Sequence, residues 1–222
     1  FTIDATLIPD FGQVTFDDEV LNLTPFEQEF DENRPFFTEG ADLFKIVDRA
    51  SFRGGSFFYS RRIGQRTSIN EDEILNDGDQ LLSFDETPKL LNSIKLTGTT
   101  NNNLSIGFIN AITDKSYALI RENNDNIRKE LITPLTNFNV LSLSQKIIND
   151  YSSIGFINGS LNRESSFEDA NNYAFMANIF DDKRAFSFKG YYYKTYSPRL
   201  SKRSGQRKII TIEELKGNFR YW

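Results

Sequence analysis

The chain of 222 residues has no cysteine and no histidine, and only one methionine and one tryptophan. Without thiolate or imidazole groups it cannot form a disulfide, a Ser-His-Asp triad, a histidine-ligated haem or a zinc site of the usual kind. It also lacks an apolar run of about 18 residues, so no membrane-spanning helix is expected. The formal net charge is −5, and a general nucleic-acid binder is not expected because contacts with phosphates need a cationic surface.

Aromatic residues are abundant, with 21 Phe and 9 Tyr. From residue 90 onward apolar residues alternate with polar or small ones, and this period of two predicts β-strands. The string SIGFIN occurs at 105–110 and again at 153–158. The strands expected after residue 90 are 91–100, 103–112, 137–148, 152–163, 171–180, 183–196 and 209–222, with another at 1–8. Most are longer than the roughly 5 or 6 residues of an ordinary strand.

The connections are expected to alternate in length. Short turns at 100–103, 149–152 and 181–183 are rich in Asn and Asp, whereas 113–136, 163–171 and 197–208 read as longer polar connections. Transmembrane β-barrels sort short turns and long loops to opposite sides, and they carry aromatic residues at both interfaces. Residues suited to these interfaces are Tyr191, Tyr192, Tyr193, Tyr196, Phe219, Tyr221 and Trp222.

These patterns predict an all-β fold, an antiparallel up-and-down transmembrane β-barrel that is present in part. Its lipid-facing side chains would be Leu104, Ile106, Phe108, Phe186, Phe188 and Phe219. The alternative is a soluble β-sandwich or jelly roll, which would bury the same residues in its core.

Residues 9–89 differ from the rest, with prolines at 9, 25 and 35 interrupting dense charges and with Phe recurring singly or in pairs. A connection of this length inside a compact domain is usually structured or functional, and we expect an insertion that plugs or rims the lumen. Residues 1–222 would then belong to one barrel domain, with a meander of about seven long strands at 90–222. The strand pattern still runs at Trp222, and barrels of this class have even strand numbers, so we expect the chain to be truncated.

Three long blocks carry a resemblance to a known family: FTIDATLIPDFGQV (1–14), LNLTPFEQEFDENRPFFTEGADLF (21–44) and FFYSRRIG (57–64). They resemble a family of outer-membrane β-barrel proteins from Gram-negative bacteria, whose members often carry an upstream carbohydrate-binding family 9-like domain. The family motifs match at 9–14, 32–40 and 57–64. Residues 95–114 and 134–147 look like membrane strands of that family. The resemblance implies a location in the cell outer membrane.

The block at residues 32–40 (ENRPFFTEG) combines charged residues with paired aromatics. We expect Arg34 to pair with Glu39, because a charge enclosed in protein must be paired, and Phe36 and Phe37 to anchor the segment against the barrel wall. Lining of the lumen, or stacking on a sugar, is the alternative for these residues.

The adjacent residues Arg61 and Arg62 would point to opposite faces of a strand. One of them would reach the lumen, where Asp10 or Glu39 could pair with it. The basic connection 197–208 could meet lipopolysaccharide phosphates.

The acidic residues between 17 and 32 give many carboxylate pairs but none preferred for glycoside hydrolysis, so no catalytic residue, metal or cofactor is expected. The predicted function is solute passage, binding or assembly support at the outer membrane. The expected partners are outer-membrane lipid and lipopolysaccharide, with glycans or other outer-membrane proteins, and no nucleic acid. The alternative is a surface or secreted carbohydrate-binding β-domain, or a glycan hydrolase that uses carboxylates.

Overall fold

The computed structural model describes residues 2–7, 31–44, 57–67, 69–164, 167–197, 203–215 and 220–221. The fold of these residues is all-β and antiparallel, with two sheets and four short helical turns, which confirms the predicted fold class at this level. The helical turns are α1 (Pro35–Thr38), η1 (Ala41–Phe44), η2 (Ser60–Arg62) and α2 (Glu71–Ile74). Three residues singled out by the sequence, Asp10, Phe219 and Trp222, lie outside the described residues. No helix in the described ranges is long and apolar enough to cross a membrane.

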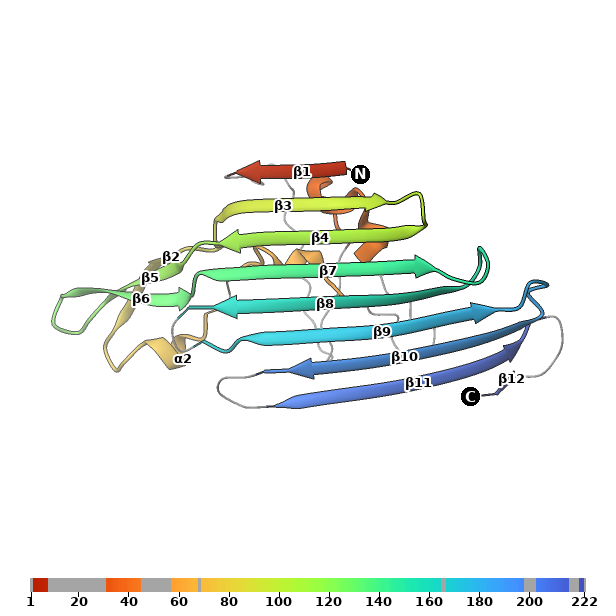
Figure 1. The fold of residues 1–222 in the computed structure, drawn as a ribbon. Coiled ribbons are helices and arrows are strands. Elements are labelled where there is room, and N and C mark those ends of the chain that lie inside the picture. Colours follow the sequence, from red (N-terminus) through yellow and green to blue (C-terminus); the bar gives the residue numbers. More distant parts are fainter. Residues whose placement is uncertain are drawn as a thin grey trace.

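A nine-stranded antiparallel sheet makes up most of the structure (Figure 1). Its strands lie in the order β1 (Thr2–Leu7), β3 (Leu90–Thr99), β4 (Leu104–Thr113), β7 (Thr136–Lys146), β8 (Ser153–Arg163), β9 (Ala170–Phe180), β10 (Phe186–Tyr196), β11 (Ser204–Glu214) and β12 (Arg220–Tyr221). A smaller sheet contains β2 (Gln80–Phe84), β5 (Ser116–Arg121) and β6 (Ile127–Thr133). It extends beyond the ends of β4 and β7 (Figure 1).

Several sequence-based expectations need correction. The nine-stranded sheet is open in the part of the chain that the structure describes, with β1 and β12 at its two edges, so no closed barrel is formed there. The expected strand 209–222 is divided between β11 and β12. The expected loop 113–136 contains the hairpin of β5 and β6, whose alternation is too short to stand out in the sequence. Part of the basic connection 197–208 belongs to β11.

The connections also alternate in length less than expected. The turns 100–103, 147–152 and 181–185 lie at one end of the sheet, and the hairpin of β5 and β6 lies at the other end (Figure 1). However, the connection 164–169 is no longer than the turn 147–152. Loop length therefore gives weaker support to a barrel than the sequence suggested, and the two faces of the sheet become the more informative feature.

One face of the nine-stranded sheet, here called the Ile109 face, packs against the helical turns. Phe37, Phe44 and Ile63 from the inserted segment share one buried cluster with Ile109 and Val140 from the sheet. Other positions of this face are small or polar and are also buried, namely Ser93, Lys95, Thr97, Thr113, Thr136, Ser142, Ser187 and Thr211. The inserted segment thus provides much of the apolar surface of this core.

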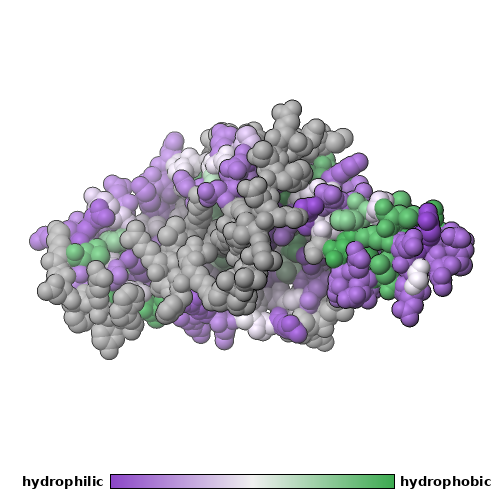
Figure 2. Space-filling model, turned by 180° about the vertical axis from the view of Figure 1, so that it is seen from behind, coloured by the Kyte–Doolittle hydropathy of each residue, from purple (hydrophilic) through white to green (hydrophobic). Residues whose placement is uncertain are grey.

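The three-stranded sheet has an apolar surface of its own. Figure 2 shows hydrophobic side chains gathered on this sheet, seen from the side opposite to Figure 1. Its large exposed apolar residues are Leu82, Leu119 and Ile127. Arg128 on β6 ties the preceding segment to the sheet through Asp79, with 3.0 Å between the guanidinium nitrogen and the carboxylate oxygen.

The turn between β7 and β8 contains a strained residue. Ile148 has a φ of 62° and is 79% exposed. Replacing Ile148 with Asn is expected to raise the free energy of unfolding by about 1 kcal/mol, because the left-handed conformation costs a β-branched residue roughly 1–2 kcal/mol and costs Asn less. Denaturant titration in detergent measures the change. The matched control is Asn103→Ile, at a φ of 60°, which is expected to lower stability; shifts of the same sign in both variants would contradict the strain argument.

Candidate functional site

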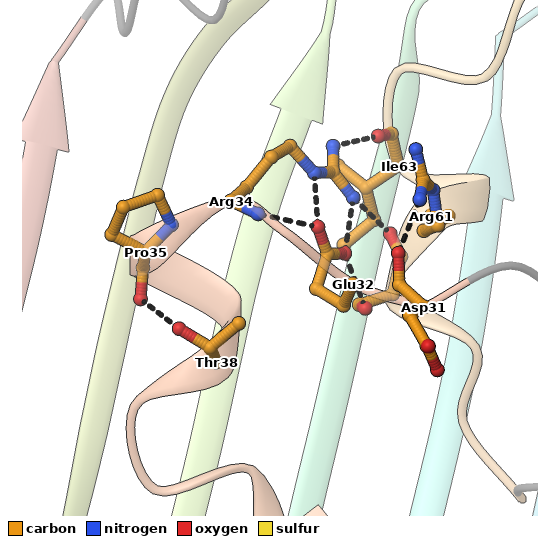
Figure 3. A network of polar contacts seen from close by, with 8 residues as sticks. Asp31, Glu32, Arg34, Pro35, Thr38, Arg61 and Ile63 are labelled. Atoms are coloured by element: carbon orange, nitrogen blue, oxygen red, sulfur yellow. Dashed lines mark hydrogen bonds and ion pairs between the residues drawn. The ribbon is translucent and has the colours of Figure 1, made fainter. Parts of the chain in front are cut away.

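The two motifs that stand out in the insertion meet around Arg34 (Figure 3). Its guanidinium donates to the Glu32 carboxylate at 2.7 and 2.8 Å, to the Ile63 carbonyl at 2.7 Å and to the Ser60 carbonyl at 2.9 Å. The Ser60 hydroxyl donates to Glu32 at 2.6 Å. The planar fork of Arg suits this arrangement, because it presents several donors in fixed directions. These contacts hold the segment around Glu32 against the turn at Ser60, which lies 28 positions further along the chain.

The arginines differ in their partners from the sequence prediction. Arg34 pairs with Glu32 and not with Glu39. Arg61 and Arg62 lie in the 3-10 turn η2 rather than on a strand, so they do not alternate between two faces. Arg61 donates to the Asp31 carbonyl, which adds a second contact between the two motifs (Figure 3).

Lys95 connects the inserted segment to the sheet. It lies on β3, is fully buried, and donates from Nζ to the Phe36 carbonyl at 2.6 Å and to the Glu39 carbonyl at 3.1 Å. The Lys95 ammonium also lies 5.1 Å from the centre of the Phe36 ring. A buried ammonium needs such partners, because an isolated buried charge is very costly. Lys95 is not among the residues predicted from the sequence, where its only signal is a charged residue on the same strand face as Ser93 and Thr97.

Close packing joins the turn η1 to the sheet. A β-carbon added at Gly107 on β4 would lie 2.9 Å from ring atoms of Phe44 and 3.2 Å from Leu43 Cβ. Phe44 is 4% exposed, so its ring has little room to move. Replacing Gly107 with Val is expected to lower the free energy of unfolding by about 1–3 kcal/mol, because overpacking forces neighbours out of position.

Denaturant titration of the Gly107 variant measures this cost. The matched control is Gly190→Val, because a β-carbon there would meet only ordinary contacts at 3.5 Å or more, with Phe188. Equal losses of stability at both sites would contradict the role of η1 packing, because Val is favoured over Gly in strands and its propensity cannot cause a loss.

The cluster around Arg34 also makes the attachment of the insertion sensitive to acid. Burial alone would raise the pKa of the Glu32 carboxyl, but hydrogen bonds from Arg34 and Ser60 and the charge of Arg34 hold that pKa below its ordinary value of 4.5. A carboxyl whose pKa is lower in the folded state stabilises the fold above its unfolded pKa, and this contribution is lost as the pH falls through the lowered value.

We therefore expect the stability of the wild type to decrease as the pH falls below about 4.5. Stability is measured by denaturant titration from about pH 7 to about pH 3. Glu32→Gln, which cannot titrate at this position, is expected to show a smaller decrease over that interval. Parallel pH profiles for the two proteins would contradict the assignment to Glu32.

The opposite face of the nine-stranded sheet, here called the Phe188 face, carries an exposed apolar band. Phe188 is 40% exposed and Ile210 is 63% exposed. The large exposed apolar residues of this face are Ile94, Ile154, Phe175, Phe186, Phe188, Ile210 and Ile212, and they come from β3, β8, β9, β10 and β11. Leu104, Ile106 and Phe108 on β4 lie on the same face, half-buried. The band therefore extends across most of the sheet.

The position of the apolar band changes from strand to strand. Leu141 on β7 lies opposite Asn158 on β8, whereas Phe156 on β8 lies opposite Phe175 on β9. From β7 to β10 the band thus moves toward the end with the turns 147–152 and 181–185. Such a shift keeps the band level when the strands are tilted, as they are in barrels.

A row of amides and tyrosines borders the band on the side away from those turns. Asn110 donates to the side chains of Asn137 and Asn139 at 2.7 and 2.8 Å, and Asn158 donates to Asn171 at 2.7 Å. Asn110 and Asn158 end the two SIGFIN strings, which lie on β4 and β8, the two neighbours of β7, with Asn110 opposite Asn139 and Asn158 opposite Leu141. On β9 and β10 the row continues with Tyr173 and Tyr192, whose ring centres lie 6.3 Å apart.

The expected aromatic residues are divided between the two faces. Tyr191 and Tyr193 lie on the Ile109 face, with their rings stacked 6.3 Å apart, whereas Tyr192 and Tyr196 lie on the Phe188 face. Alternation along a strand makes this division unavoidable. The lipid-facing candidates Phe186 and Phe188 are both exposed on the Phe188 face.

The arrangement defines an antiparallel β-sheet protein in which a packed insertion covers one face of the large sheet and the other face carries an apolar band. No group of His, Cys, Asp or Glu suited to hold a metal occurs among the described residues. The chain belongs to the family described as Domain of unknown function (DUF5916), whose sequence model matches residues 1–222. Neither the comparison with curated proteins nor the comparison with solved structures gave a match.

Proposed function

We propose that this chain forms part of the wall of a β-barrel in the outer membrane of a Gram-negative bacterium. The inserted residues 31–44 and 57–64 would lie on the lumen side, and the protein would serve solute passage, binding or assembly support without catalysis. The observation that carries the proposal is the apolar band of the Phe188 face.

The distribution of residues over the two faces supports contact with lipid. Water-soluble monomers rarely expose large continuous apolar patches, and here exposed Ile and Phe side chains extend from β3 to β11. Barrels in the outer membrane are apolar outside and polar inside, with aromatic residues at the interfaces. The Phe188 face with Tyr173 and Tyr192 fits the outside, and the Ile109 face, where small and polar side chains such as Ser142 and Thr211 are buried beside apolar ones under the insertion, fits the inside.

A soluble sandwich would need a second sheet on the Phe188 face. The three-stranded sheet instead extends beyond the ends of β4 and β7 (Figure 1), and Phe188 stays exposed. In lipid, unpaired strand edges cost several kcal/mol for each unsatisfied backbone group. The proposal therefore includes pairing of both sheet edges, β1 and β12, to close the barrel.

Site-directed spin labelling tests the proposal directly, because the chain has no cysteine to remove. A label at Phe188→Cys is expected to be accessible to oxygen and protected from a water-soluble nickel complex in bilayers. The matched control is a label at Lys183→Cys, in the exposed turn 181–185, which is expected to be accessible to nickel. Nickel accessibility at both positions would contradict contact with lipid.

Fractionation of cells that produce the protein tests its location. We expect recovery with outer membranes, and migration in electrophoresis that changes when the detergent extract is boiled. A soluble protein recovered without detergent would overturn the proposal, and a glycan-binding screen would then test the carbohydrate-binding alternative.

A further inference from the structure

Two lysines lie beside the tyrosines that border the apolar band. Lys194 on β10 is directly opposite Tyr173 on β9, and Lys208 on β11 is directly opposite Tyr192 on β10. The Lys208 ammonium lies 5.8 Å from the centre of the Tyr192 ring. All four side chains are on the Phe188 face, so they form one cluster across three neighbouring strands.

The cluster carries positive charge that no acid neutralises among the residues that the structure describes. Neither Lys194 nor Lys208 is paired with a carboxylate in those ranges. The chain as a whole has a net charge of −5, so this local excess of cations is opposite in sign to the protein average.

Apolar side chains follow this cationic cluster along β10 and β11, in the direction of the turn 181–185. On β11 the next residue on the same face after Lys208 is Ile210, followed by Ile212, and both are exposed. On β10 the face continues from Lys194 through Tyr192 to Phe188. Along either strand, toward the turn 181–185, this face presents first a cation, then an aromatic ring or a branched aliphatic side chain, and then further apolar side chains. This order matches a molecule with an anionic head and hydrocarbon chains.

We propose that Lys194 and Lys208, together with Tyr173 and Tyr192, bind the phosphate head group of a membrane lipid whose acyl chains lie on the apolar band. The inference rests on the proposed function, because it needs the Phe188 face to contact lipid. Lysines near a membrane surface attract anionic head groups, and tyrosines place an apolar ring and a polar hydroxyl at the boundary.

Retention of lipid A tests the assignment. The full chain in a neutral detergent is mixed with lipid A, separated by size exclusion, and analysed for phosphorus per protein over a range of lipid A concentrations. Replacing both lysines by Gln is expected to weaken binding roughly thirtyfold, about fivefold for each lysine. Binding to the wild type is also expected to fall at high salt.

The matched control is Lys129→Gln. Lys129 also lies over a tyrosine, with its ammonium 3.9 Å from the centre of the Tyr117 ring, but on the three-stranded sheet. Like each of the two lysine substitutions, this variant removes one positive charge beside a tyrosine ring. It is expected to bind lipid A like the wild type. Equal binding by all variants would overturn the proposal.

Competition with inorganic phosphate distinguishes a lipid site from a simple anion site. We expect inorganic phosphate to displace little lipid A, because it cannot occupy the apolar band, and efficient displacement would overturn the lipid assignment. The spin label at residue 188 separates this inference from the proposed function. Contact with lipid at residue 188, combined with unchanged binding by the double variant, would reject only the role of the lysines.

Discussion

Replacing Phe188 with Arg is expected to destabilise the protein in a bilayer by about 2–4 kcal/mol, because that is the cost of a cation near the bilayer midplane on the lipid side of a barrel. The same change in water should be nearly neutral, since Phe188 is 40% exposed and an Arg there would stay hydrated. The variant therefore separates the two environments, whereas a change at a buried position would be harmful in both. Folding yield and denaturation midpoint in lipid vesicles measure the effect.

The matched control for this prediction is Asn162→Arg. Asn162 is exposed on the same face, on β8, but lies outside the apolar band. Near the interface the cost of Arg falls to about 0–1 kcal/mol, so the control should fold like the wild type. Equal stability of the two Arg variants in vesicles would contradict the assignment of the band to the membrane interior.

The strands and their faces could largely be predicted from the sequence. The alternation of Ile106 and Phe108 with Ser105 and Gly107 assigns them to opposite faces, because successive side chains of a strand point to opposite sides. The period of two does not show which face is exposed. That question is decided by the inserted segment, whose Phe37 and Phe44 cover the Ile109 face.

The contacts of the insertion could not be predicted in the same way. The charges in residues 32–40 allow Arg34 to pair with either Glu32 or Glu39, and spacing alone gives no preference. The choice depends on Ser60 and Ile63, which approach from a distant part of the chain. Once the backbone carbonyls of these residues accept from Arg34, the guanidinium is held where Glu32 reaches it. Long-range contacts of this kind leave no periodic signal.

The insertion and the sheet depend on each other for burial. Ile109 and Val140 would lose the side chains that cover them if the segment were absent, and Phe37 would lose the core that covers it. Lys95 fixes the insertion on the sheet through the Phe36 and Glu39 carbonyls, and Arg34 ties the two parts of the insertion to each other. Displacing the segment would therefore open the Ile109 face, which is the lumen side in the proposed barrel.

Replacing Arg34 with Ala is expected to destabilise the attachment of the insertion by about 3–5 kcal/mol, because removing one partner of a buried ion pair leaves the other charge unpaired. The side chains of Arg34 and Glu32 are only 10% and 15% exposed. Arg34 also stacks over Phe37, with its guanidinium carbon 4.3 Å from the ring centre. Hydrogen exchange should therefore increase in residues 31–44 and 57–64, while β7 and β8 stay protected.

The control for this change is Arg66→Ala. Arg66 pairs with Glu86 at 3.4 Å, with side chains 51% and 62% exposed, and such surface pairs contribute only about 0–1 kcal/mol. In the proposed barrel, Arg34→Ala should also raise ion conductance across planar bilayers, because a loosened segment no longer fills the lumen. Faster exchange without a change in conductance would keep the role of Arg34 in attachment but reject the segment as a plug. Unchanged exchange would show that the insertion is held mainly by its apolar residues.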